Sequence, residues 1–100
     1  MKFILKGPLQ NNINNMTRKI GYYFLEKKEA KSEYVFVRLI SGNNYPRFHL
    51  FIKTENGDLI FNLHLDQKRP IYEGAPAHAG EYEGETVEKE AERIKEILKK

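Results

Sequence analysis

The dipeptide Asn56-Gly57 constrains the fold of this chain more than any other short segment, because alternating apolar residues flank it on both sides. Both central residues of a type I′ turn need positive φ angles, which asparagine and glycine adopt most readily. The segment therefore predicts a β-hairpin whose strands cover residues 47–54 and 58–66. A two-residue loop also fixes which residues face each other. The predicted pairs are Glu55 with Asp58, Ile52 with Phe61, Leu50 with Leu63, His49 with His64 and Arg47 with Asp66.

The two faces of this predicted hairpin differ in polarity. Side chains alternate between faces along a strand, so one face collects Phe48, Leu50, Ile52, Leu59, Phe61, Leu63 and Leu65. The other, mixed face sets Arg47, His49, Phe51 and Lys53 opposite Asp66, His64, Asn62 and Ile60. We expect the apolar face to meet the core. Phe51 and Ile60 indicate that the mixed face is also partly covered, by the following loop or by a second subunit.

The rest of the chain completes an α+β pattern. Residues 2–6, 20–26 and 34–40 favour strands, whereas the amide-rich residues 10–15 predict irregular structure and leave room for one helical turn over 15–19. Residues 86–99 place Val87, Ala91, Ile94 and Leu98 on one stripe, as in an amphipathic helix. We therefore predict an antiparallel sheet of about five strands, a meander, with one C-terminal amphipathic helix packed on one face. Residues 67–84 predict a long loop.

Composition narrows the class of protein. The 100 residues, 40% hydrophobic and 31% charged, predict a single domain over residues 1–100. No run of about 20 apolar residues could span a membrane and no signal peptide is evident, so we expect a soluble cytoplasmic protein without membrane contact. The chain has no cysteine, which excludes disulfides and thiolate metal sites. Any metal would need histidine, aspartate or glutamate ligands.

A candidate site gathers at the open end of the hairpin. The mixed face carries His49, His64 and Asp66, and the loop that follows carries His78 and Glu81. Facing residues in a hydrogen-bonded pair have Cα atoms about 5.5 Å apart. Two imidazoles at that spacing can share an ion such as zinc, which takes three or four ligands. The five residues are therefore candidate ligands of a divalent metal.

The same surface suits two other kinds of chemistry. His64 or His49 could act as a general base oriented by Asp66, and an anion would find the cations Arg47, Lys68 and Arg69. A hydrolytic or phosphoryl-transfer enzyme is the reaction class that combines these features. No motif of diagnostic spacing decides between an enzyme and a binding protein. The simplest alternative is an ion pair between Arg47 and Asp66, with histidines on an exposed sheet face.

Two further functions remain open. Residues 1–54 carry ten Lys/Arg and three Glu, a net charge of +7, while residues 55–100 carry seven Lys/Arg and eleven Asp/Glu, or −4. A basic N-terminal half with Arg18, Lys19, Tyr22 and Arg38 could bind nucleic acid through charge and base stacking. Core packing is the commoner use of such aromatic residues. The third function is a protein-interaction domain that forms a homodimer through a sheet edge or the mixed face.

Three strings of residues resemble those of a known group of proteins. They are Tyr45-Pro46-Arg47-Phe48-His49, Leu63-His64-Leu65-Asp66-Gln67-Lys68 and His78-Ala79-Gly80-Glu81-Tyr82-Glu83-Gly84. They are similar to strings in a family of small uncharacterised prokaryotic proteins of unknown function, over most of residues 18–95. This resemblance implies a family but no activity, ligand or catalytic residue.

Overall fold

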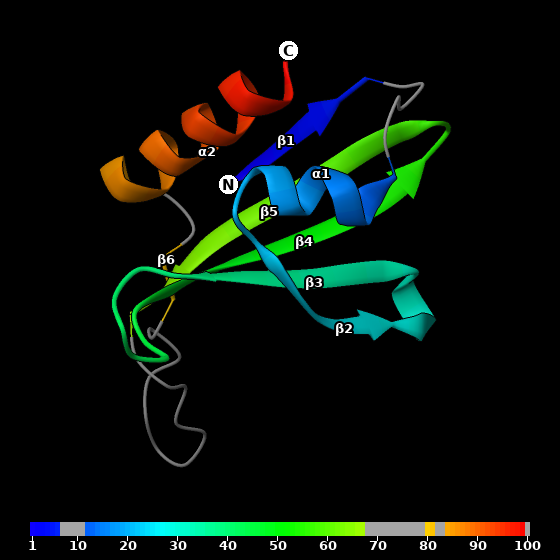
Figure 1. Cartoon of the computed structure of the whole chain (residues 1–100). Helices are drawn as coiled ribbons and strands as arrows, with labels where there is room; N and C mark the ends of the chain where they lie inside the picture. Colours follow the sequence, from blue (N-terminus) through cyan, green and yellow to red (C-terminus); the bar gives the residue numbers. More distant parts are fainter. Residues whose placement is uncertain (7–11, 68–79, 82–83, 100) are drawn as a thin grey trace.

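The fold combines one antiparallel sheet with two helices (Figure 1). The computed structural model describes residues 1–6, 12–67, 80–81 and 84–99. The elements are β1 (Lys2–Leu5), α1 (Ile13–Lys19), β2 (Tyr23–Lys28), the 3₁₀ turn η1 (Glu29–Lys31), β3 (Glu33–Leu39), β4 (Arg47–Glu55), β5 (Asp58–Asp66), β6 (Gly80–Glu81) and α2 (Glu85–Leu98). Both helices lie on the same side of the sheet, so the predicted α+β class is confirmed.

The strands lie in the order β1-β5-β4-β3-β2, and every neighbouring pair is antiparallel. Strands β2 to β5 follow one another as the predicted meander. Strand β1 lies beside β5, where Phe3 faces Phe61, and the short β6 pairs with the end of the same strand. Residues far apart in the sequence therefore meet on β5. Among the described helices, none has the length and apolar character needed to cross a membrane.

The central hairpin has the predicted register. The pairs are Arg47 with Asp66, His49 with His64, Leu50 with Leu63, Ile52 with Phe61 and Glu55 with Asp58. Asn56 and Gly57 have φ angles of 53° and 83°, the positive values that the two-residue turn requires. The turn therefore places the two histidines opposite each other, as the sequence predicts.

The N-terminal region differs from its predicted structure. Instead of irregular chain, α1 begins at Ile13, where the side-chain oxygen of Asn12 accepts a 2.8 Å hydrogen bond from the backbone N–H of Asn15. An asparagine in this N-cap position satisfies a donor that the helix leaves unpaired. Ile20 is then the helix C-cap and is fully buried, so β2 begins at Tyr23 and not at residue 20. The end of the amide-rich segment thus supplies the start of a helix.

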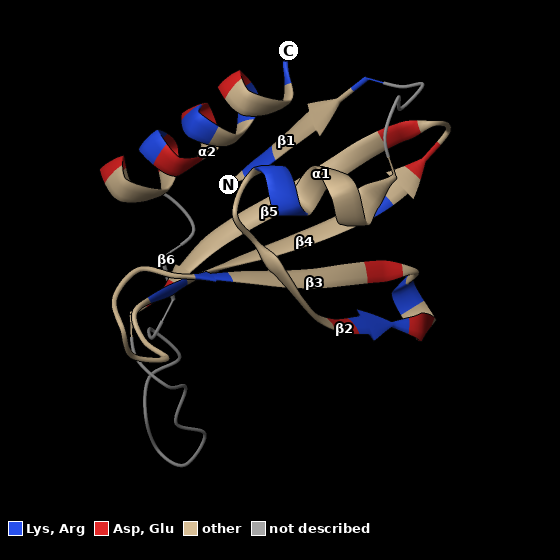
Figure 2. Cartoon of the chain, viewed as in Figure 1, with Lys and Arg blue, Asp and Glu red and all other residues tan. Residues whose placement is uncertain are grey.

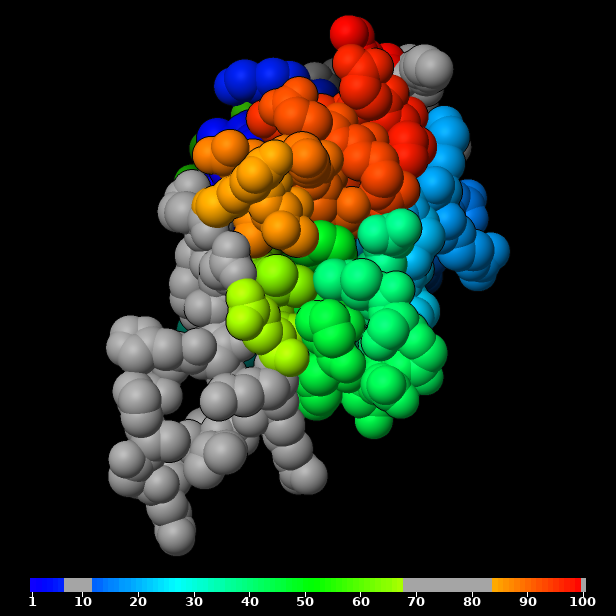
Figure 3. Space-filling model, turned by 90° about the vertical axis from the view of Figure 1, so that its left-hand side faces the viewer, coloured from blue at the N-terminus to red at the C-terminus, as the bar shows by residue number. Residues whose placement is uncertain are grey.

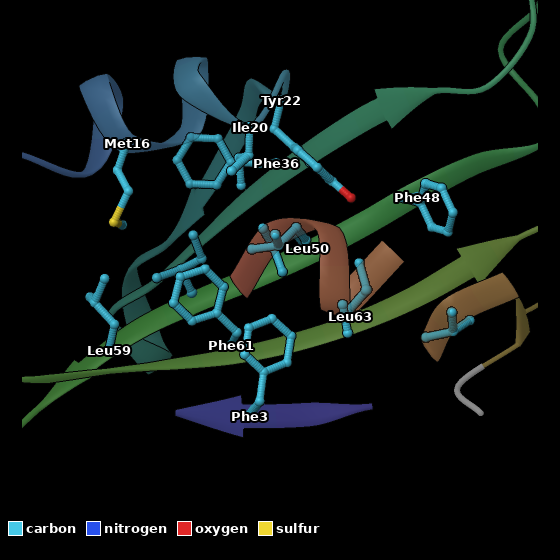
Figure 4. Close-up of a cluster of buried hydrophobic side chains, with 14 of the residues drawn as sticks. Phe3, Met16, Ile20, Tyr22, Phe36, Phe48, Leu50, Leu59, Phe61 and Leu63 are labelled. Carbon is cyan, nitrogen blue, oxygen red and sulfur yellow. The ribbon is translucent and has the colours of Figure 1, made fainter. Parts of the chain in front are cut away.

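The core fills the space between the sheet and the two helices (Figure 4). Figure 4 labels ten of its side chains, including the rings of Phe3 and Phe61, which stack with centroids 4.9 Å apart. On α2 the predicted stripe is confirmed: Val87, Ala91 and Ile94 are buried, and Leu98 packs against them. Figure 3 views the end of the sheet where β5 (yellow-green) finishes, with α2 (orange) above it. This core fixes the hairpin that carries the candidate site.

One acidic residue of α2 is buried with the apolar stripe. Glu90 is only 5% exposed. It accepts a 2.6 Å hydrogen bond from the Tyr22 hydroxyl and two more from Arg93, from Nε at 2.7 Å and Nη2 at 2.8 Å. Arg93 also donates to the carbonyl of Ile20, and Arg38 of β3 lies 3.5 Å from Glu90. This polar network joins α2 to the α1–β2 connection and to β3.

Candidate functional site

The candidate site lies on the face of the sheet opposite the core. Leu63 and Leu65 of β5 belong to the core cluster, so the alternating residues His64 and Asp66 project from the other face. His49 of β4 faces His64 across the strand pair, and Asp66 lies one alternation further along the same face. The three residues therefore come together because of the register that the Asn-Gly turn imposes.

The carboxylate of Asp66 lies between the two imidazole rings. Its Oδ2 atom contacts Nδ1 of His49, and its Oδ1 atom lies 3.4 Å from Nε2 of His64. The two imidazole centroids are 5.1 Å apart. One potential ligand atom from each of the three residues falls within 4.8 Å of the others. Two nitrogens and a carboxylate thus converge on one small volume.

His64 and Asp66 are buried and His49 is largely covered, contrary to the exposed sheet face that the simplest alternative expects. The side chains of His49, His64 and Asp66 are 14%, 8% and 7% exposed. Phe51 of β4 lies edge-on to the His64 ring, with centroids 5.1 Å apart, and tilted against His49 at 6.0 Å. Val37, which faces His49 from β3, is also buried. An apolar surround of this kind strengthens the electrostatic interactions among the three residues.

The surroundings of Asp66 favour its ionised form. Burial by itself raises the pKa of this carboxyl, but the hydrogen bonds from His49 and then His64, together with their charges, hold the pKa well below its ordinary value. Asp66 is therefore an anion throughout the physiological pH range. An ionised carboxylate is what both a metal ligand and the orienter of a histidine base must provide.

Arg47 faces Asp66 across the hairpin, yet the ion pair expected between them is absent from the described part of the chain, where Asp66 pairs with the two histidines. The Arg47 guanidinium instead lies over the ring of Tyr45, with its carbon 4.6 Å from the centroid. Its Nε atom is buried without a hydrogen-bond partner. Tyr45 is not among the predicted site residues, although its place two residues before a strand arginine is a signal that could have identified it.

The structure does not describe the side chains of the other predicted metal and anion ligands. His78, Lys68 and Arg69 lie outside the described residues. The backbone of Glu81 pairs with Leu65 in the short strand β6, and its side chain is outside the described part of the structure.

The four residues named for nucleic-acid binding are not equivalent. Arg18 and Lys19 are exposed in the last turn of α1. Tyr22 is 3% exposed and bonded to Glu90, to which Arg38 also pairs. Of the four residues, Arg18 and Lys19 are therefore the ones whose charges are exposed and available to a partner.

Comparison with known proteins supplies no function. No protein-family model matches the chain, and neither a curated protein nor a solved structure is significantly similar to it. Function is therefore inferred from the residues and their geometry alone.

Proposed function

We propose that this protein binds a divalent transition-metal ion through His49, His64 and Asp66. The observation that carries the proposal is the convergence of two imidazole nitrogens and a carboxylate oxygen within 4.8 Å. The three side chains come from paired strands of the sheet, so backbone hydrogen bonds hold their starting positions. A site prepared in this way loses little conformational entropy when an ion binds.

The dimensions suit the proposed ion after a small adjustment. Zinc binds histidine nitrogen and carboxylate oxygen at about 2.0–2.2 Å, which places tetrahedral ligand atoms about 3.3 Å from one another. The ligand atoms of the three side chains, which lie within 4.8 Å of one another, reach that spacing if side-chain rotations shift each of them by roughly 1 Å. The ion would lie between the Asp66 carboxylate and the two imidazole rings, which both contact that carboxylate.

The ligand set favours borderline metals. Imidazole nitrogen suits zinc, iron, copper and nickel, whereas magnesium and calcium prefer all-oxygen sites. Two histidines and one carboxylate form the ligand set of several catalytic zinc centres and of many non-haem iron centres. With three protein ligands, such a centre keeps a coordination position open for water or a substrate.

The open position gives the site a chemical use. A bound divalent metal lowers the pKa of a coordinated water, which supplies a nucleophile for hydrolysis. Arg47 is the cation that faces Asp66 across the hairpin, so it is the residue that we expect to bind an anionic group of a substrate. Hydrolysis of a phosphate or carboxylate ester is the reaction class that we propose for these residues.

A rival use of the same residues is purely structural. Asp66 could serve only to hold His49 and His64 in a hydrogen-bonded cluster that closes the open end of the hairpin. Added metal would not stabilise such a cluster. Metal-dependent thermal stability therefore distinguishes the two uses.

The decisive experiment measures metal content and metal-dependent stability. Purified protein is analysed for bound metal, and its thermal unfolding is recorded with and without added zinc. A ligand at 100 times its Kd stabilises by about 2.7 kcal/mol, which corresponds to roughly 10–20 °C in a domain of this size. We expect this shift in the wild type and its loss in Asp66→Asn.

Asp58→Asn is the matched control, because Asp58 is another carboxylate at the opposite end of the same strand. It should keep the full zinc shift. The proposal fails if the wild type holds no stoichiometric metal and zinc leaves its unfolding unchanged. It also fails if Asp66→Asn and Asp58→Asn respond alike.

A further inference from the structure

A second candidate site lies at the other end of the strand order, on the edge strand β2. Three consecutive large apolar side chains of β2 are exposed: Tyr23 by 49%, Phe24 by 51% and Leu25 by 42%. A regular strand would turn alternate residues away from solvent, but a bulge between Phe24 and Glu26 interrupts the alternation. An exposed run of large apolar side chains is a candidate interaction surface.

A pocket opens beside these aromatic residues. It has a volume of about 360 Å³ and is lined by Asn14, Thr17, Arg18, Tyr22, Tyr23, Phe24 and Phe36. Phe36 lies in the core and meets the ring of Phe24 at an interplanar angle of 72°. The volume lies within the range of small-ligand sites, about 300–1,000 Å³. The pocket therefore combines two exposed aromatic rings, an amide and a guanidinium.

Lysine and arginine positions lie on α1 and β2, the two elements beside the pocket (Figure 2). Residues 12–28, from the cap of α1 to the end of β2, carry four Lys/Arg and one Glu, a net charge of +3 that equals the net charge of the whole chain. Arg18 and Lys19 form no ion pair within the described ranges. A cation in the wall of an aromatic pocket, Arg18, and a second one adjacent to it in the sequence, Lys19, favour a ligand that is both anionic and planar.

We propose that this pocket between α1 and β2 binds an unpaired base of a single-stranded nucleic acid. A base stacks on the exposed ring of Phe24, which is sequence-tolerant because every base has a π face. The amide of Asn14 reaches the edge of the base, and Arg18 and Lys19 bind the neighbouring phosphates. The site is independent of the metal site proposed above.

A second copy of this chain fits the surface less well. Strand pairing of two copies through β2 would have to accommodate Lys27 and Lys28, which lie on the pairing strand itself. Lysines on an edge strand and a bulge within it are two of the features by which proteins prevent strand addition. A polyanion instead neutralises these charges.

Fluorescence anisotropy tests the proposal with a labelled oligouridylate of about ten nucleotides, which covers one small single-strand site. The salt concentration is kept low, at about 50 mM, because phosphate contacts weaken steeply with salt. An abasic strand of equal length has the same phosphates but no bases. Phe24→Leu removes the ring while keeping an apolar side chain against Phe36, and circular dichroism checks that it folds.

We expect Phe24→Leu to weaken binding by about tenfold, the loss of one stacked base. Arg18→Gln should weaken it and reduce the slope of log K against log salt by about one. Lys2→Gln is the matched control, since it removes one charge from β1 at the opposite edge of the sheet, and it should leave the affinity unchanged.

Three results would overturn the proposal. The first is no binding of oligouridylate at low salt. The second is equal affinity for the abasic strand or an unchanged affinity in Phe24→Leu, either of which would leave charge attraction alone. The third is a wild-type dimer in sedimentation that Phe24→Leu converts to a monomer, which would assign the surface to a second copy.

Discussion

The hydroxyl of Tyr22 donates a 2.6 Å hydrogen bond to Oε2 of Glu90, which lies 68 residues later in the chain. The carboxylate also receives both donors of the Arg93 fork. Tyr22 lies in the short connection between α1 and β2, while Glu90 lies on the core-facing side of α2. A charged group thus occupies a position that the apolar stripe of the helix would otherwise fill, and its stability depends on partners from three separate segments.

Removing the charge of Glu90 should destabilise the fold. In Glu90→Gln, Arg93 and Arg38 lose their shared counter-charge, and a buried amide cannot accept all the bonds that the carboxylate accepts. Because both arginines are about one third exposed, we expect a loss of about 2 kcal/mol in the free energy of unfolding, below the usual cost of breaking a fully buried pair.

Urea unfolding measures this loss. Glu92→Gln is the control, because Glu92 is an exposed residue of the same helix paired with Lys95, and its loss should stay below about 0.5 kcal/mol. Equal stabilities for the two variants would show that the network contributes nothing.

Alkaline pH should reduce the stability that the Tyr22 hydroxyl contributes to the fold. Burial, followed by the charge and hydrogen bond of Glu90, raises the pKa of the Tyr22 hydroxyl well above its ordinary value. In the unfolded chain this hydroxyl ionises near pH 10, so its contribution is complete below that pH and declines above it. The slope is up to about 1.4 kcal/mol per pH unit. Tyr22→Phe should be less stable than the wild type at pH 8, and the difference should shrink between pH 10 and 11 in urea titrations. A constant difference would contradict the role given to the hydroxyl.

Acid should destabilise the fold by protonating Asp66. Its folded-state pKa is lowered, so its contribution to the stability of the metal-free protein is complete above the unfolded pKa of about 4 and is lost as the pH falls below that value. Asp66→Asn, which does not titrate, should show a flatter loss of stability between pH 5 and 2 than the wild type. Denaturant unfolding at a series of pH values measures both curves, and parallel curves would exclude the His49–Asp66–His64 arrangement in solution.

The hairpin turn can be tested by backbone conformation alone. Gly57 has a φ angle of 83° and no atom within 4 Å of the position that a Cβ would occupy. Gly57→Ala should therefore cost about 1 kcal/mol through strain without any clash. Gly42→Ala adds a methyl group in equally open space at a glycine without a positive φ, and it should be neutral or slightly stabilising. Thermal unfolding compares the two, and similar midpoints would argue against the type I′ turn.

Local rules predicted the parts of the fold that depend on neighbouring residues. The Asn56-Gly57 turn fixed the register and so placed His49 opposite His64, and the spacing of Val87, Ala91 and Ile94 predicted the buried side of α2. The start of α1 was missed because Asn12 can cap a helix as readily as it can form a turn.

Features that depend on distant residues were not predictable in this way. Nothing near residue 3 indicates that β1 pairs with β5. Helical spacing places Glu90 on the buried stripe of α2, but no local pattern identifies Tyr22 as its partner. The burial of His64 and Asp66 depends likewise on tertiary packing, of which the apolar Phe51 and Ile60 were the only indication. The contributions of Lys68, Arg69 and His78 remain predictions.

The position of β5 also affects how the chain folds while it is being synthesised. This strand takes β1 along one edge, β4 along the other and α2 over its face. The segment that forms β1 leaves the ribosome early but must wait for its partner, and the core stays open until α2 has emerged as well. The meander of β2 to β5 can assemble from local contacts in the meantime, so newly made chains should pass through a stage in which one side of this sheet is still uncovered and most in need of chaperone protection.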